Sequence, residues 1–201
     1  MTGAHADRPA TKAGWRAHMK GVLASTSAEQ RDAWSAALCD QLLDSGLVGE
    51  AMVVLGYGAF RGEPDVSRVG DVVTRRGGRL CMPVIDWGSG TMHAGEVHTL
   101  HLGAKGGPVE GRYGTPIAPE GAEVIPAWDI GVVLVPGMAF DVRGGRLGRG
   151  AGFYDRYLRG FAGLTIGVCF DVQVIDRVPM EEGDVRLDAV ATESGVCMVR
   201  G

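Results

Sequence analysis

Apolar residues near the start of the chain recur at the spacing of an α-helix. Trp15 and Met19 lie four positions apart within residues 10–24, while Lys12 and Arg16 fall on a neighbouring face. A period of three to four residues is typical of an amphipathic helix with one buried side. The pattern therefore predicts a first helix over residues 10–24 that carries a basic stripe.

A second helical pattern follows directly, over residues 26–46. Thr26 is expected to cap its N-terminus, because Glu29 stands three residues later and completes the sequence of a capping box. Gly46 is expected to end it, since glycine readily adopts the left-handed conformation that follows a helix. The two patterns together predict consecutive helices before the first strand.

Beyond residue 50, short continuous apolar runs alternate with helical patterns, and such runs are typical of buried strands. Strands are expected over residues 51–58, 79–85, 130–136 and 164–170, helices over 65–77 and 153–161, a strand–turn–strand unit over 86–97, a loop rich in glycine and proline over 103–124, and one or two strands over 185–200. This alternation predicts an α/β fold with three layers, in which helices cover both faces of a mostly parallel central sheet.

The length and composition of the chain indicate one domain. The 201 residues, 45% of them apolar, can build one core of fair size, and no internal repeat divides them. A single domain is expected over residues 10–201. The polar residues 1–9 lack the apolar stretch of a signal peptide and are expected to form a flexible tail.

The charge balance limits the range of partners. Lys and Arg total 20 against 24 Asp and Glu, which gives a net charge of −4. An acidic chain is a poor match for nucleic acid or for an anionic membrane surface. No apolar run approaches the roughly 20 residues that a membrane-spanning helix needs. The sequence predicts a cytoplasmic protein with small-molecule partners; a monomer is expected, although the oligomeric state stays open.

Cysteines and histidines show no metal-ligand spacing. The cysteines are far apart and stand among apolar neighbours, and three of the histidines share a polar stretch without a zinc motif. The cysteines are therefore expected to be buried, reduced thiols. They are Cys39, Cys81, Cys169 and Cys197.

The strongest chemical signal is the segment GGRLGRGAGFYD, residues 144–155. Five glycines fall within nine residues, with Arg146 and Arg149 among them. Phosphate groups bind backbone N–H donors and positive charge where no side chains intervene, and this loop supplies all three conditions. It also follows the strand over 130–136, at the edge where open α/β sheets bind ligands. We interpret it as a phosphate-binding loop, with an irregular surface turn as the alternative.

Two common nucleotide motifs do not fit this loop. No GK[ST] sequence follows the glycines, so a Walker A loop is excluded. The glycines do not give the GxGxxG spacing of a dinucleotide fold, and the preceding strand ends near Pro136, some nine residues before Gly145. A dinucleotide-dependent oxidoreductase is therefore a weaker alternative.

A longer stretch, LVPGMAFDVRGGRLGRGAGFYDRYL (residues 134–158), resembles the signature of the 5-formyltetrahydrofolate cyclo-ligase family. Lys12 and Arg16 fit the family's N-terminal K-x-x-x-R, while Tyr57 and Glu63 resemble its strand and loop with a downstream glutamate. A later series of family positions is matched by Gln173, Pro179, Asp184 and Asp188. The resemblance thus touches most of the chain.

The resemblance implies an activity. Members of the family convert 5-formyltetrahydrofolate to 5,10-methenyltetrahydrofolate, with ATP as co-substrate, Mg²⁺ as cofactor, and ADP and phosphate as products. A formamide oxygen is a poor leaving group, and its phosphorylation makes it a good one before N10 of the folate closes the ring. The protein is then expected to hold a triphosphate in line with a formyl oxygen.

The resemblance also implies roles for individual residues. Arg149 is expected to be catalytic, because a guanidinium can bridge two phosphate oxygens in the transition state. Asp155 and Asp184 are expected to hold Mg²⁺. Folate is expected to contact Tyr57, Glu63, Arg149, Gly152 and Phe153. ATP is expected to contact Lys12, Arg16, Arg146, Leu147, Gly148, Arg149, Gly150, Ala151, Gly152, Phe153 and Tyr154.

Taken singly, some of these residues have plainer interpretations. Without the resemblance, Asp155 is an acid in the first turn of a helix, Lys12 and Arg16 form a solvated helix face, and Glu63 stands where a helix begins. Their combination, and no single one of them, favours the functional interpretation.

The sequence departs from the family pattern at two places. Residues 114–119, GTPIAP, stand where many members have a turn with a glutamate, and the glutamate is absent. Ala151 stands where some members have a lysine that could touch phosphate. These departures leave two alternatives open: a non-catalytic paralogue that binds folate or nucleotide, and an ATP-dependent enzyme that acts on another formamide.

Overall fold

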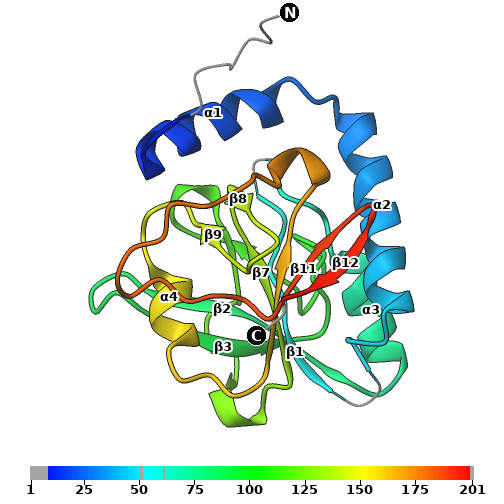
Figure 1. The fold of residues 1–201 in the computed structure, drawn as a ribbon. Coiled ribbons are helices and arrows are strands. Elements are labelled where there is room, and N and C mark those ends of the chain that lie inside the picture. The colour runs from blue at the N-terminus through cyan, green and yellow to red at the C-terminus, as the bar shows by residue number, and fades with distance from the viewer. Residues whose placement is uncertain (1–8, 50–51, 61, 200–201) are drawn as a thin grey trace, which may run out of the picture.

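The structure is a computed structural model that describes residues 9–49, 52–60 and 62–199. The expected tail, apart from Pro9, lies outside the described residues, as does the first residue of the strand expected over 51–58. The rest of the chain folds around one central sheet (Figure 1). The positions of its edges decide where the segment over residues 144–155, called the glycine loop below, lies.

The strands of this sheet are β1 (Val53–Leu55), β2 (Arg79–Asp86), β3 (Thr91–Val97), β6 (Val124–Ile125), β7 (Val132–Pro136), β10 (Leu164–Val168), β11 (Ala189–Thr192) and β12 (Gly195–Met198). Within the described residues they form one eight-stranded sheet, in the order β12-β11-β10-β7-β1-β2-β3-β6. The inner strands from β11 to β2 run parallel, and the outer ones pair antiparallel. The predicted mostly parallel sheet is confirmed.

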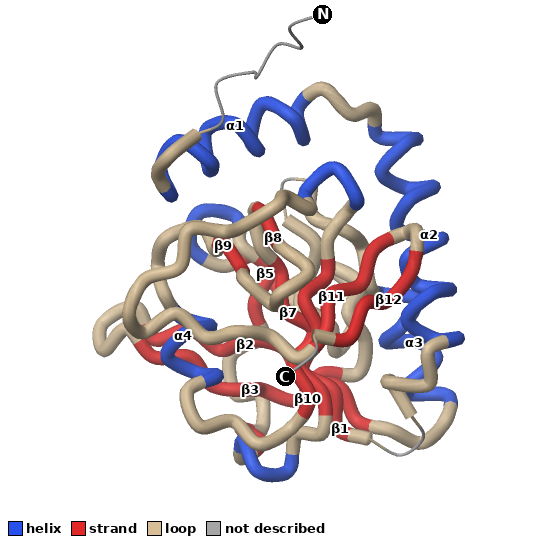
Figure 2. The backbone as a smooth tube through the Cα atoms, in the orientation of Figure 1, coloured by secondary structure: helices blue, strands red, loops and turns tan. Residues whose placement is uncertain are grey.

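Helices cover both faces of the sheet, as Figure 2 shows in blue, and this confirms the predicted three layers. α2 (Ala28–Asp44) and α3 (Ser67–Arg75) share a core cluster with Val54 of β1. α4 (Phe153–Leu158) belongs to the opposite cluster, together with Leu55. Because successive side chains of a strand point to opposite faces, adjacent residues of β1 serve different layers.

α1 (Lys12–Ala24) lies outside these layers, at the top of Figure 1. Its apolar side packs through Met19 onto a short ribbon formed by β8 (Ala139–Phe140) and β9 (Arg146–Leu147). The predicted amphipathic helix is confirmed. Its packing brings the basic stripe beside the glycine loop, which contains β9.

The second helix begins one residue later than expected. Ser27, not Thr26, caps it, and the Ser27 hydroxyl accepts a hydrogen bond from the backbone N–H of Gln30 at 3.1 Å. Thr26 instead donates its hydroxyl to the carbonyl of Leu23 at 2.8 Å, because the end of α1 has unpaired carbonyls to satisfy. Gly46 follows the C-cap with a φ of 71°, which confirms that it ends the helix.

The region between β2 and β6 holds more regular structure than expected. β2 and β3 form one hairpin with Asp86 opposite Thr91, in place of a separate strand–turn–strand unit over 86–97. Within the expected loop over 103–124, β4 (Val109–Glu110) pairs with β5 (Pro116–Ile117). Pairs of two-residue strands carry too little periodicity to be predicted.

The remaining helical turns are short. Within the described ranges, three 3-10 helices span Arg112–Gly114, Ala127–Asp129 and Asp171–Gln173. α4 ends at Leu158, earlier than the predicted residue 161, and Gly160 follows it with a φ of 78°. None of the described helices combines the length and the apolar content that a bilayer crossing requires.

One cysteine departs from the prediction. Cys39, Cys81 and Cys169 are free and buried, whereas Cys197 is free and exposed. It lies on the edge strand β12, where its neighbour Val196 packs toward the cluster under α2. Alternation along the strand therefore turns Cys197 to the other face.

A buried carboxylate fixes the turn that leads into the glycine loop. Asp141 is 1% exposed. Its Oδ1 accepts hydrogen bonds from the backbone N–H groups of Arg143 at 2.9 Å and Gly145 at 3.0 Å. Its Oδ2 accepts one from Val178 at 2.7 Å. One side chain thus aligns the loop with the segment that leads to Asp184.

Asp141→Asn tests this anchor. The substitution keeps the volume but turns an amide group toward a backbone N–H, which leaves a buried donor unsatisfied. We expect the free energy of unfolding to fall by about 1–3 kcal/mol, measured by urea denaturation. Asp129→Asn, at an exposed position, is the matched control and should change it by less than about 0.5 kcal/mol. Equal changes in the two variants would contradict the anchoring role.

Candidate active site

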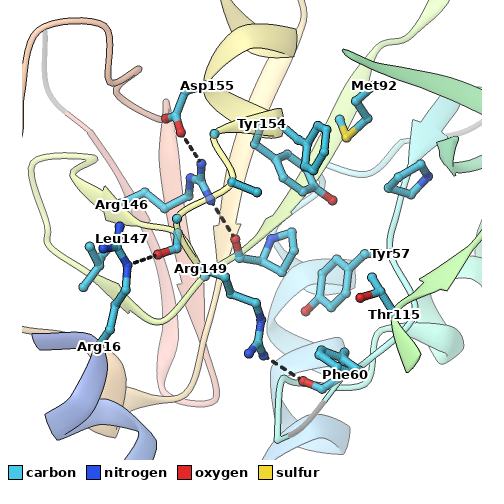
Figure 3. A pocket seen from close by; sticks show the side chains of 18 of the residues that line it. Arg16, Tyr57, Phe60, Met92, Thr115, Arg146, Leu147, Arg149, Tyr154 and Asp155 are labelled. Atoms are coloured by element: carbon cyan, nitrogen blue, oxygen red, sulfur yellow. Dashed lines mark hydrogen bonds and ion pairs between the residues drawn. The ribbon is translucent and has the colours of Figure 1, made fainter. Parts of the chain in front are cut away.

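A large cavity lies at the carboxyl edge of the parallel strands. Its volume is about 870 Å³, which is within the range of small-molecule sites. It is lined by the residues that follow β1, by the ends of β2 and β7, by the start of α1 and by the glycine loop. Figure 3 shows Arg16 and Arg146 on one side of it, and Tyr57 and Phe60 on the other.

Every residue that the family resemblance associates with a ligand lines this cavity. The structure brings together parts of the chain that are widely separated in sequence, although the individual roles stay predictions. The residues are Lys12, Arg16, Tyr57, Glu63, Arg146, Leu147, Gly148, Arg149, Gly150, Ala151, Gly152, Phe153, Tyr154, Asp155 and Asp184.

Two arginines and the backbone of the glycine loop form the basic end of the cavity. Arg16 donates from Nε to the carbonyl of Gly148 at 2.8 Å. The side chain of Arg146 is only 5% exposed; it donates from Nη1 to the carbonyl of Pro136 at 3.2 Å and from Nη2 to Oδ2 of Asp155 at 3.1 Å. A guanidinium held in this way is a preorganised positive charge. This end of the cavity suits a phosphate chain.

Lys12, the first residue of α1, is held by two carboxylates. Its Nζ lies 2.6 Å from Oδ2 of Asp184 and 3.1 Å from Oε2 of Glu181. Burial lowers the pKa of Lys12, but its hydrogen bonds to the two carboxylates outweigh burial, so the pKa is raised. Burial raises the pKa of Asp184, and the hydrogen bond from Lys12 more than reverses this, so the pKa is lowered. Both groups therefore stay charged at neutral pH.

The two aspartates expected to hold Mg²⁺ both line the cavity and keep one carboxylate oxygen for an ion that arrives with a phosphate ligand. Among the described residues, no group of three or more His, Cys, Asp or Glu side chains is arranged to hold a metal. Mg²⁺ is usually bound by one or two carboxylates together with phosphates and water. Asp155 and Asp184 each use Oδ2 for a cation, and no hydrogen bond among the described residues engages either Oδ1. The donor set fits that mode.

Arg149 crosses from the glycine loop to the loop after β1. Its Nε donates to Oε1 of Glu63 at 2.9 Å, and its Nη2 donates to the carbonyl of Phe60 at 3.0 Å. The side chain of Glu63 is 6% exposed, against 38% for Arg149. Burial raises the pKa of Glu63, and the Arg149 charge opposes this rise. The expected catalytic residue is thus anchored by a residue expected to contact folate.

Aromatic side chains that sequence reasoning missed form the other end of the cavity. Trp87 contacts Phe153 and Tyr113 edge-on, with ring centroids 5.1 and 5.8 Å apart. Thr115 and Pro116, in the turn that departs from the family pattern, also line it. That departure was the one available signal, because Trp87 and Tyr113 lie in turns that only the tertiary fold brings together.

Two tyrosine hydroxyls lie in the cavity wall. Tyr57 donates to the carbonyl of Pro64 at 3.0 Å. The hydroxyl of Tyr154 is buried, and none of the described residues hydrogen-bonds to it. Burial raises the pKa of both tyrosines, so both stay neutral donors. A buried hydroxyl without a hydrogen-bond partner among the described residues is an exception in folded proteins.

A parallel sheet with a glycine- and arginine-rich loop at its carboxyl edge is the arrangement of an α/β protein that binds a phosphorylated ligand. The sequence matches the model of the 5-formyltetrahydrofolate cyclo-ligase family over residues 8–193. The chain belongs to this family, which confirms the resemblance drawn from its sequence.

Individual relatives agree with this assignment. The 5-formyltetrahydrofolate cyclo-ligase of Mycolicibacterium smegmatis is 34% identical over 173 residues, which cover 78% of this chain and 81% of that protein. The protein of the same name from Escherichia coli K12 is 40% identical over 77 residues; the match spans 37% of this chain and only 42% of that protein. The solved 5,10-methenyltetrahydrofolate synthetase of Aquifex aeolicus is 28% identical, with a TM-score of 0.76 over 94% of this chain and 93% of its own.

Close backbone contact holds the glycine loop against the segment before β11. Gly144 has a φ of 79°, and a Cβ at this position would lie 2.3 Å from the carbonyl oxygen of Leu187. The backbone N–H of Leu187 donates to the carbonyl of Gly144 at 2.9 Å. Both the conformation and the contact therefore require glycine.

Gly144→Ala is expected to lower the free energy of unfolding by more than about 3 kcal/mol, because a left-handed alanine and a backbone clash add together. Gly46→Ala is the matched control, since Gly46 has a φ of 71° with no atom within 4 Å of its Cβ position. It should lower the free energy by only about 1–2 kcal/mol. The free energies of unfolding of both variants are measured by chemical denaturation. Similar losses in the two would show that the Leu187 backbone moves away from the added Cβ at little cost.

Proposed function

We propose that this protein converts 5-formyltetrahydrofolate to 5,10-methenyltetrahydrofolate while ATP is cleaved to ADP and phosphate. The observation that carries the proposal is the placement, around one cavity, of all fifteen residues that the resemblance associates with a ligand. Membership of the family and the names of the relatives support the choice of substrate.

The proposal divides the cavity between the two substrates. The triphosphate lies at the basic end, against the glycine loop, Arg16 and Arg146, where fixed donors and positive charge favour it. The folate lies at the aromatic end, where Trp87 and Phe153 offer flat apolar surface. Arg149 stands between the two ends, and its contact with the loop after β1 supports a place at the reacting atoms.

The chemistry runs in two steps. The formyl oxygen attacks the γ-phosphorus, the new O–P bond forms, and the bond to the β-phosphate oxygen breaks to release ADP. N10 of the folate then attacks the formyl carbon, the C–O bond to phosphate breaks, and N10 loses its proton as the ring closes. The protein contributes alignment of the reacting atoms and stabilisation of charge on the transferring phosphoryl group.

We propose Asp155 and Asp184 as the residues that hold Mg²⁺. When bound, the ion neutralises negative charge on the phosphates. The two carboxylates are oriented in advance by their hydrogen bonds from Arg146 and Lys12. A cytoplasmic location and a monomeric state stay predictions from the sequence.

A second candidate follows from the altered turn over residues 114–119. Thr115 and Pro116 of this turn line the cavity, so the missing family glutamate falls beside the proposed folate position. An ATP-dependent enzyme that acts on another formamide would keep the basic end and differ here.

The first test is an absorbance assay. Purified protein is mixed with Mg-ATP and 5-formyltetrahydrofolate, and the methenyl absorption band is followed. We expect a rise that requires all three components and that EDTA abolishes. No rise with folate bound in calorimetry would indicate the non-catalytic binder, and ATP cleavage with another formamide alone would favour the second candidate.

Arg149→Ala separates catalysis from binding. If Arg149 stabilises charge in the transition state, kcat should fall by about 10²–10³-fold while the Kd for ATP changes by less than about threefold. Arg149→Lys should restore little, since a lysine cannot bridge two oxygens. Arg75→Ala, at an exposed position of α3, is the control. Equal losses in kcat and ATP affinity would limit Arg149 to ground-state binding.

A further inference from the structure

The aromatic end of the cavity opens to solvent. Tyr57, in the cavity wall, is 4% exposed, whereas Trp87 and Tyr113, which also line the cavity, are 38% and 65% exposed. The cavity thus runs from a buried wall to an open rim that Trp87 and Tyr113 form. A ligand longer than the cavity passes these two rings on its way to solvent.

Arg112 lies over both rings of the rim. Its guanidinium carbon is 5.3 Å from the centre of the Trp87 ring and 4.9 Å from the centre of the Tyr113 ring, which is the range of a cation–π contact. The residue is exposed, and its guanidinium makes no hydrogen bond or ion pair with any described residue. Its N–H donors are therefore available to a ligand.

The turn that carries Arg112 has an unusual backbone conformation. Tyr113 has a φ of 62° and a ψ of 18°, a left-handed conformation that bulky residues rarely adopt. The backbone N–H of Gly111 donates to the carbonyl of Thr115 at 2.8 Å and closes the turn. Residues held in strained conformations are concentrated at ligand-binding sites. Here the conformation sets two neighbouring side chains, Arg112 and Tyr113, against the same indole ring of Trp87.

The acids near the rim leave the charge of Arg112 unpaired. Asp86, next to Trp87, is engaged within its own turn: its Oδ1 accepts a hydrogen bond from the backbone N–H of Gly88 at 2.8 Å, and its Oδ2 accepts one from the Ser89 hydroxyl at 2.7 Å. Glu110, two residues before Arg112, forms no ion pair with it in the described part of the chain. The rim therefore presents a positive group that an anionic part of a ligand can pair with.

We infer that Arg112 binds a glutamate carboxylate of the folate substrate and so sets a preference for substrates with a charged tail. The inference rests on the proposed function, which puts the formyl group beside the triphosphate and the folate rings at the aromatic end. The p-aminobenzoyl group then extends toward the rim, and the glutamate that follows it ends there. A guanidinium matches the two oxygens of a carboxylate, and the two rings hold its plane before the substrate arrives.

Removing the charge from each partner in turn tests the inference. The substrates are 5-formyltetrahydrofolate and its bis-amide, in which both glutamate carboxylates are replaced by primary amides of similar size. With wild type we expect the KM to be about tenfold higher for the bis-amide than for the acid. Arg112→Gln should raise the KM for the acid about tenfold, change kcat by less than about twofold, and leave the KM for the bis-amide unchanged, because that substrate has no charge to lose.

Two further variants separate charge from packing. Arg75→Gln, at an exposed position of α3, is the matched control and should change neither KM. Arg112→Lys keeps the charge without the planar fork and should restore only part of the preference for the acid. If Arg112 only packs on the rim, Arg112→Gln raises the KM for both substrates by the same factor. That result, or equal KM values for the two substrates with wild type, would overturn the inference.

Failure of the proposed function gives a different pattern. A wild-type protein that binds folate and forms no methenyl product fails the proposed reaction, and calorimetry then makes the same comparison from the Kd values of the acid and the bis-amide. A preference of about tenfold for the acid that Arg112→Gln abolishes would still support the inference, and equal Kd values would overturn it. A wild-type protein that binds neither ligand would overturn both proposals.

Discussion

A loop rich in glycine has few side chains with which to pack, so buried polar groups must hold it in place. Asp141 does so through backbone N–H groups of its own turn and of Val178. Gln173 fixes the neighbouring segment between β7 and β8: its Nε2 donates to the carbonyl of Gly137 at 3.0 Å, while its Oε1 accepts from the N–H of Phe170 at 2.9 Å. Hydrogen bonds of this kind set a backbone position that apolar packing alone leaves loose. The rest of the cavity is built on that position.

Three cations of the cavity are paired with acids. Arg146 contacts Asp155, Arg149 contacts Glu63, and Lys12 contacts Asp184. Each pair sets a positive group beside an acid in a partly dry site, where an isolated charge is costly. An anionic ligand therefore meets positive side chains that are already oriented. It replaces carboxylates as their hydrogen-bond partner and does not have to assemble the site.

The elements predicted well are those whose burial is visible over several consecutive residues. The helix over 10–24 shows one-sided periodicity, and the strands over 130–136 and 164–170 are continuous apolar runs that the structure buries. The ribbon of β8 and β9 was missed because each strand is two residues long. The residues of the glycine loop were singled out because they stand together in one signature, and Arg16 was singled out by a separate N-terminal motif. Trp87 and Tyr113 were not, because their meeting depends on how a hairpin and a loop fold over each other.

The contribution of α1 to the cavity has a consequence for the order in which the site forms during synthesis. Arg16 contacts Gly148 across 132 residues of sequence, and Lys12 contacts Asp184 across 172. On the ribosome, α1 emerges early and has no partner for its basic stripe until the later segments have followed. A nascent chain therefore gains the complete basic end of the cavity only when nearly all the matched region has been made, so a ligand that needs this end stabilises the finished protein and not its precursors.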